Sequence, residues 1–153
     1  MGGGSFLFLP FDNGSVLETL SEDDLIFEQL IKLLHPDICY KKIEGYLQPY
    51  QASKLIEMCD LTMCMRLHPI IMSLKNKVPV VGIGYDQKVR NVMEMCGVED
   101  WCVSVEKIKG CDLCKRMEWM YKNREALSKR LEQVCEKMKK AAKDNIDFIK
   151  NFL

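Results

Sequence analysis

Short apolar runs alternate along this chain with segments in which apolar residues recur every three or four positions. The apolar runs predict five strands, at residues 6–9, 38–43, 61–65, 78–83 and 101–103. The helical spacing predicts helices at residues 21–35, 49–58, 69–76 and 89–96, and from residue 113 onward. Because strands and helices alternate, the pattern predicts parallel strands covered by helices, as a three-layer α/β/α domain with about five parallel strands.

The ends of the chain carry less information about the sheet. Residues 1–5 lack apolar periodicity and are interpreted as a flexible leader or a cloning remnant, so that residues 6–153 form a single domain. Near the other end, Leu127, Leu131, Val134 and Met138 form an apolar stripe at helical spacing. The stripe is consistent with a coiled-coil seam, but its short length favours one long helix packed across the sheet.

Composition excludes several functional classes. The chain has 153 residues, of which 48% are hydrophobic and 29% charged, with 22 basic and 22 acidic residues. This balance argues against a protein that coats nucleic acid or an acidic membrane surface. No apolar segment reaches the length of a transmembrane helix, and no signal peptide is present, so we expect a cytoplasmic protein.

Eight cysteines raise the question of disulfides or metal binding. Most of them lie among apolar residues in predicted strands and helices, where a free cysteine behaves as a small hydrophobe. Cys111 and Cys114 have the spacing of a redox pair or of half a zinc site, but no matching second pair follows. We therefore expect free thiols, an incidental Cys-x-x-Cys spacing and no metal site.

Arg66 and His68 follow the predicted strand 61–65 and precede a helix. Backbone N–H groups and the helix dipole favour anions at such a place. The arginine side chain can bind a carboxylate or phosphate through two parallel hydrogen bonds, and the histidine can exchange a proton near neutral pH. The alternative is a structural ion pair, for instance with Asp60, beside a histidine without a catalytic role.

A second polar segment follows the next predicted strand and reads Gly82-Ile83-Gly84-Tyr85-Asp86-Gln87-Lys88. Glycines here let a ligand approach the backbone, Lys88 offers a positive charge, and Asp86 can orient it or accept a proton. A tight turn between strand and helix explains the glycines equally well without a ligand. Two such turns on neighbouring strands strengthen the interpretation as a site.

The elements Met65-Arg66-Leu67-His68 and 78–89, which reads VPVVGIGYDQKV, closely resemble the signature of the polysaccharide pyruvyl transferase family. The resemblance covers residues 6–150 and corresponds to the C-terminal half of such enzymes. It implies a Rossmann-like domain, similar to one lobe of a two-lobe GT-B-like enzyme. It also implies transfer of pyruvate from phosphoenolpyruvate onto two sugar hydroxyls as a ketal, as in the biosynthesis of exopolysaccharides and cell-wall polymers.

The resemblance also implies roles and partners. Arg66 and His68 would be catalytic, with Arg66 holding the carboxylate or phosphate of the donor and His68 acting as acid or phosphate ligand. The substrate-binding set would be Arg66, Gly84, Tyr85, Asp86 and Lys88. Phosphoenolpyruvate would be a substrate, so no cofactor is expected. The acceptor would be a sugar or a lipid-linked saccharide, and an N-terminal lobe or partner chain would complete the cleft, without which turnover would be weak.

Two other functions remain open from the sequence. The chain is also consistent with half of a GT-B nucleotide-sugar glycosyltransferase, in which Glu99 or Asp100 would hold ribose hydroxyls. A non-catalytic interaction module, docking through Leu131 and Met138 of the C-terminal helix, is the other alternative. The module does not explain why polar residues collect at two adjacent strand ends.

Overall fold

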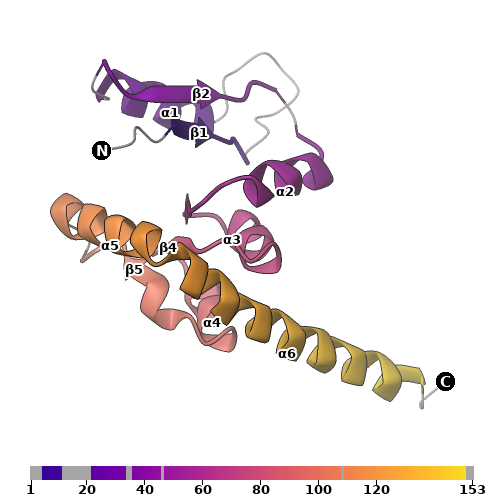
Figure 1. Cartoon of the computed structure of the whole chain (residues 1–153). Helices are drawn as coiled ribbons and strands as arrows, with labels where there is room; N and C mark the ends of the chain where they lie inside the picture. Colours follow the sequence, from indigo (N-terminus) through magenta and orange to yellow (C-terminus); the bar gives the residue numbers. More distant parts are fainter. Residues whose placement is uncertain (1–4, 12–21, 34–35, 46, 108, 151–153) are drawn as a thin grey trace. The chain divides into compact units, whose positions relative to one another are not determined.

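The computed structural model describes residues 5–11, 22–33, 36–45, 47–107 and 109–150, and these form two compact units, Met1–Ala52 and Ser53–Leu153 (Figure 1). The strands are β1 (Ser5–Phe8), β2 (Cys39–Lys42), β3 (Thr62–Cys64), β4 (Val80–Gly84) and β5 (Cys102–Ser104). The helices are α1 (Glu22–Leu33), α2 (Pro49–Glu57), α3 (Leu67–Lys75), α4 (Gln87–Met95), α5 (Gly110–Lys122) and α6 (Arg124–Lys150).

The first unit is a strand–helix–strand arrangement. β1 and β2 pair in parallel, with Ser5 opposite Cys39, so Ser5 belongs to the strand and not to a leader. Aromatic packing joins α1 to this sheet, because the rings of Phe8 and Phe27 lie 5.1 Å apart between centroids. The predicted helix start at Ser21 lies outside the described residues.

The second unit contains a three-stranded parallel sheet in the order β3-β4-β5. Cys64 pairs with Gly82, Gly82 with Cys102, and Gly84 with Ser104. Because the three strands run in the same direction, their carboxyl ends lie at one edge of the sheet. This edge receives the segments that lead into α3 and α4, which is where open α/β sheets usually bind ligands.

The core of the second unit forms where the helices cover this sheet. Its central residues are less than 2% exposed and include Ile70 of α3, Val81 of β4 and Met93 of α4. Leu127 and Leu131 of α6 complete the same cluster. Burial of apolar side chains of this size stabilises a fold by about 1.5–3 kcal/mol each, so these contacts fix the positions of α3 and α4 on the sheet.

Helix α6 packs on the sheet only along its first half. Leu127 and Leu131 are buried, whereas Met138 is 38% and Ile146 is 53% exposed. Figure 1 shows the second half of α6 extending past the sheet of its own unit toward the C-terminus. Packing, rather than a coiled-coil seam, is therefore confirmed for the first half, and the helix continues through Asn145.

The predicted fold class is confirmed. Within the described residues, five parallel strands in two sheets and six helices fit a Rossmann-like α/β fold. Trp101 was expected in a strand, but it ends a 3-10 turn, η1 (Glu99–Trp101), before β5 begins. The indole is large and 1% exposed, and it enters the core from this turn. The organisation as a single domain stays a prediction.

Candidate functional site

The two predicted motifs follow neighbouring strands of the three-stranded sheet. After β3, Met65 and Arg66 lead into α3, and after β4, Tyr85 and Asp86 lead into α4. Since β3 and β4 pair in parallel, both helix starts lie at the same edge of the sheet. The structure thus gives the two polar segments the arrangement that the sequence predicted, at the carboxyl ends of adjacent strands.

The amino terminus of α3 is formed by Arg66 and His68. Arg66 is the N-cap residue, with extended backbone (φ −85°, ψ 148°), and no side-chain hydrogen bond caps the helix. Its side chain is half-buried and His68, in the first turn, is exposed. The first-turn N–H groups of an α-helix have no acceptor within the helix, so those of Leu67 and His68 favour an anion.

The amino terminus of α4 is built differently. Asp86 is the N-cap residue, and its Oδ1 accepts a hydrogen bond of 3.0 Å from the backbone N–H of Lys88. The carboxylate therefore satisfies a donor that a ligand would otherwise use. Tyr85 is 55% exposed and the side chain of Lys88 is exposed, so both are accessible from solvent.

Close packing accounts for the glycines of β4. A Cβ atom at Gly82 would collide with Sδ of Met93. At Gly84 it would lie 2.9 Å from Sγ of Cys102 and 3.2 Å from Cγ of Arg90. Both glycines are buried, so packing within the fold explains them and the turn does not require a bound ligand.

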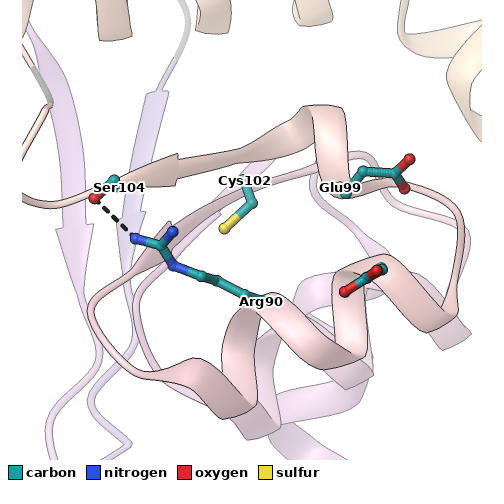
Figure 2. A pocket seen from close by; sticks show the side chains of 5 residues that line it. Arg90, Glu99, Cys102 and Ser104 are labelled. Carbon is teal, nitrogen blue, oxygen red and sulfur yellow. Dashed lines mark hydrogen bonds between the residues drawn. The ribbon is translucent and has the colours of Figure 1, made fainter.

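A pocket of about 190 Å³ lies beside α4 and β5 (Figure 2). Its lining residues are Arg90, Glu94, Glu99, Cys102 and Ser104. None of the residues predicted to bind the donor lines it, although Nη2 of Arg90 donates a 3.4 Å hydrogen bond to the carbonyl oxygen of Gly84. The same nitrogen donates a 2.8 Å hydrogen bond to Oγ of Ser104.

Sequence reasoning missed this pocket, except for Glu99. Arg90 lies four residues after Asp86, and residues at this spacing lie on the same face of a helix. The sequence therefore could have placed Arg90 near the turn that Asp86 begins. Ser104 follows the predicted last strand by one residue. Asp100, the other acid considered with Glu99, does not line the pocket, and its carboxylate pairs with Arg130 at 3.4 Å.

Asp60 is the residue that the sequence offered as a structural ion-pair partner for Arg66. The carboxylate of Asp60 lies 3.2 Å from Nε of Arg124, so Asp60 has an ion-pair partner on α6. A common binding pocket for Arg66, His68 and the 84–88 turn stays a prediction. What the structure establishes is their placement at two adjacent helix starts.

The cysteines are free thiols in the structure. Cys111 and Cys114 are exposed in the first turns of α5, with 3.7 Å between Sγ of Cys111 and Oδ1 of Asp112. Burial raises the pKa of the Cys102 thiol, and it raises that of Cys64 to about 11. Across the described segments, no three His, Cys, Asp or Glu side chains gather as a metal site.

Comparison with known proteins adds the family. A family model described as polysaccharide pyruvyl transferase matches residues 5–87, more than half of the chain. The chain belongs to the polysaccharide pyruvyl transferase family. The match includes Arg66, His68 and the turn from Gly84 to Gln87, and it ends before Lys88. The chain matches no solved structure.

The family match covers the strands that lead to both predicted motifs. It spans β1 to β4 and ends at the first residue of α4, so it contains both strand ends that carry the predicted motifs. The pocket beside β5 lies in the part of the chain that the family model does not match. None of the helices of the described residues is long and apolar enough to cross a bilayer.

Proposed function

We propose that this chain is the donor-binding lobe of a polysaccharide pyruvyl transferase. It binds phosphoenolpyruvate and takes part in the transfer of pyruvate onto two hydroxyls of a saccharide as a ketal. The observation that carries the proposal is the placement of Arg66 and His68 at the amino terminus of α3, within the family match. This is an uncapped helix start with two adjacent groups that suit an anion.

Donor binding rests on charge-assisted hydrogen bonds. The guanidinium of Arg66 holds the carboxylate or phosphate of phosphoenolpyruvate through two parallel bonds, each worth about 1.5–3 kcal/mol. The N–H groups of the first turn of α3 add donors of fixed direction. Lys88 supplies a second positive charge from the neighbouring helix start, while Tyr85 and the backbone of Gly84 line the donor site.

His68 moves the proton that the reaction requires. A proton is added to the terminal vinyl carbon of phosphoenolpyruvate, and the neighbouring carbon becomes an oxocarbenium-like electrophile. One sugar hydroxyl adds to this carbon and releases its proton to a base. A second hydroxyl then displaces phosphate to close the ketal. A positioned acid contributes about 10²–10⁴-fold, and Arg66 and Lys88 stabilise the departing phosphate.

Asp86 takes a positioning role in this scheme. Its carboxylate caps α4 through the N–H of Lys88, and this hydrogen bond fixes the turn that carries Tyr85 and Lys88. A carboxylate in contact with the negatively charged donor would weaken donor binding by like-charge repulsion, so the proposal assigns Asp86 to the cap and not to a donor contact.

In the proposal, a second lobe completes the cleft in which the acceptor reacts. In the proposal an N-terminal lobe, in the same protein or in a partner chain, supplies the other wall of the cleft and excludes water during transfer. The acceptor is a sugar or lipid-linked saccharide. A cytoplasmic location gives access to phosphoenolpyruvate and belongs to the same proposal.

Ligand selectivity tests the proposed function. Isothermal titration of the 153-residue chain with phosphoenolpyruvate, UDP-glucose and UDP-galactose should show binding of phosphoenolpyruvate only. Arg66→Lys should weaken it, because lysine cannot form the two parallel bonds. Arg124→Lys is the matched control, since Arg124 pairs with Asp60. Binding of a UDP-sugar alone would support the glycosyltransferase alternative, and equal affinity in Arg66→Lys would remove the role of Arg66.

Of the two residues named for the interaction-module alternative, only Met138 can test it. Leu131 is fully buried, so Leu131→Asp would disrupt the core rather than a docking surface. Met138, at 38% exposure, remains accessible. A module predicts that Met138→Asp abolishes biological activity and that His68→Ala does not, whereas the transferase predicts the reverse.

A further inference from the structure

We propose that the pocket lined by Arg90, Glu94, Glu99, Cys102 and Ser104 binds one sugar ring of the acceptor saccharide through its vicinal hydroxyls. The identification of the sugar as the acceptor rests on the proposed function. The pocket itself is a separate site from Arg66 and His68, and no residue of the predicted donor site lines it.

Three charged side chains converge on this pocket without ionic partners. Among the described residues, Arg90, Glu94 and Glu99 form no ion pair, although Arg90 and Glu94 are four positions apart on α4. Figure 2 shows Arg90 and Ser104 at one end, Glu99 at the other, and the thiol of Cys102 between them. Partners for these groups are therefore expected from a ligand or from water.

The guanidinium of Arg90 is held in place but retains donors for a ligand. Its Nη2 bonds Ser104 at 2.8 Å and the carbonyl oxygen of Gly84 at 3.4 Å. Its Nε and Nη1 donate to no acceptor within the described part of the chain. A side chain anchored at one nitrogen presents the others in a fixed direction, which lowers the entropy lost on binding.

The charge of the lining selects against the donor. One guanidinium and two carboxylates give the pocket a net formal charge of −1, which repels the phosphate and carboxylate of phosphoenolpyruvate. A neutral polyol suits it better. Each sugar hydroxyl can donate to Glu94 or Glu99, which only accept when ionised, and can accept from Arg90.

Size and chemistry agree with a single sugar ring. The volume of about 190 Å³ lies below the roughly 300–1,000 Å³ of pockets for drug-sized ligands. Arg90, Glu94 and Glu99 are exposed, so the pocket is open to solvent and the rest of a saccharide chain can extend out of it. Burial raises the pKa of the Cys102 thiol and keeps it protonated, which fits a contact surface rather than a nucleophile.

The position of the pocket relates it to transfer. It lies along β5 and α4, and Arg90 contacts the carbonyl of Gly84, the last residue of β4. The predicted donor groups follow β3 and β4 at the same edge of the sheet. The Arg90 and Ser104 end of the pocket adjoins this edge, whereas Glu94, near the end of α4, and Glu99, before β5, lie toward the opposite edge. A sugar bound against Arg90 would therefore lie next to the donor site.

Protection of Cys102 from alkylation tests this inference in the 153-residue chain. Iodoacetamide labelling is followed residue by residue by mass spectrometry, with methyl β-D-galactopyranoside, methyl β-D-glucopyranoside and methyl α-D-mannopyranoside as probes. At least one glycoside should slow labelling of Cys102 about threefold or more at saturation. Labelling of the exposed Cys111 should not change and serves as the internal control.

Variants of the two carboxylates sharpen the test. In Glu94→Gln/Glu99→Gln, the glycoside concentration needed for half-protection should rise about tenfold or more, because hydrogen bonds to charged acceptors are lost. Glu125→Gln, which removes an exposed carboxylate from α6, should leave it unchanged. Unchanged protection in the double variant, or no protection by any glycoside, would overturn the inference.

The outcomes separate this inference from the proposed function. Protection of Cys102 by phosphoenolpyruvate at lower concentration than by any glycoside would assign the pocket to the donor and overturn the inference. Protection by UDP alone would assign it to a ribose diol and likewise overturn it. Glycoside protection without phosphoenolpyruvate binding would confirm a sugar pocket and remove pyruvyl transfer. Phosphoenolpyruvate binding sensitive to Arg66, without glycoside protection, would do the opposite.

Discussion

The starts of α3 and α4 lie at the same sheet edge but differ in what satisfies them. At α4 the carboxylate of Asp86 accepts a backbone hydrogen bond, so the helix caps itself. At α3 the N-cap residue is Arg66, which has only donors, and no side chain caps the helix. In the proposed function, this difference makes α3 the main anion site, and the α4 start adds Lys88 and Tyr85 from a turn that Asp86 holds in place.

The largest effect is expected from removing the positive charge at α3. Arg66→Ala should reduce the affinity for phosphoenolpyruvate about tenfold to a hundredfold, since each charge-assisted bond contributes about 1.5–3 kcal/mol. Asp86→Asn keeps the capping oxygen and removes a negative charge, so its affinity should not fall. Titration calorimetry measures both. Equal losses in the two variants would show that the two helix starts bind the donor alike.

Filling the space beside Gly84 is expected to have the next largest effect. In Gly84→Ala the new Cβ would lie 2.9 Å from Sγ of Cys102, and such overpacking costs about 1–3 kcal/mol. Thermal unfolding should show a lower Tm, and adding Cys102→Ala should restore part of it. Gly110→Ala is the control, because nothing lies within 4 Å of its Cβ. An unchanged Tm in Gly84→Ala would mean that the turn relaxes freely.

The cap on α4 should matter for stability and not for donor binding. Asp86→Ala removes the acceptor for the N–H of Lys88, and loss of such a cap costs about 1 kcal/mol. Chemical denaturation should show this loss, while Asp86→Asn should retain most of the stability. Phosphoenolpyruvate affinity of Asp86→Ala should stay equal or rise. A fall in affinity without a fall in stability would make Asp86 a ligand contact instead of a cap.

Sequence reasoning predicted the fold well because the governing signals are local. Parallel strands appear as apolar runs, and a glycine just after a helical segment is a typical helix stop, as Gly97 is here with a φ of 64°. Asn123 lies between α5 and α6, and its side chain donates a hydrogen bond to the carbonyl oxygen of Trp119, near the end of α5, rather than capping the start of α6. Either role fits an asparagine between two helices, so the residue type alone could not decide.

The site was predictable only in its placement. Adjacent strand ends follow from topology, so Arg66 and Asp86 could be assigned to one edge before any coordinates. The pocket at Arg90 could not, because it depends on which side chains of α4, η1 and β5 meet in space. Pairings such as Asp60 with Arg124, 64 residues apart, are likewise invisible to local patterns.

The thiol pKa values of Cys64 and Cys102 compare the two outer strands of the sheet, β3 and β5. Cys64, at the end of β3, has a pKa of about 11, raised by burial. Cys102, on β5, also has a raised pKa because of burial, but the guanidinium of Arg90 opposes the shift. We therefore expect iodoacetamide to label Cys102 at lower pH than Cys64. Labelling of Cys64 at lower pH than Cys102 would indicate that the end of β3 is more hydrated than β5.

The free energy of unfolding should depend on pH because the pKa of Cys64 is higher in the folded chain than in the unfolded chain. Below the ordinary pKa of 9.0 the Cys64 thiol is neutral in both folded and unfolded chains, so its contribution is complete. As pH rises toward 11, the unfolded chain ionises first, and the folded state loses stability. Between about pH 8 and about pH 9.5 the loss from Cys64 should stay under about 1 kcal/mol. Thermal unfolding at both pH values should show a smaller difference in Cys64→Ala than in Cys111→Ala, which removes an exposed thiol. Equal differences would mean that Cys64 is not shielded from water, and that the β3 end is as open as the pocket beside β5.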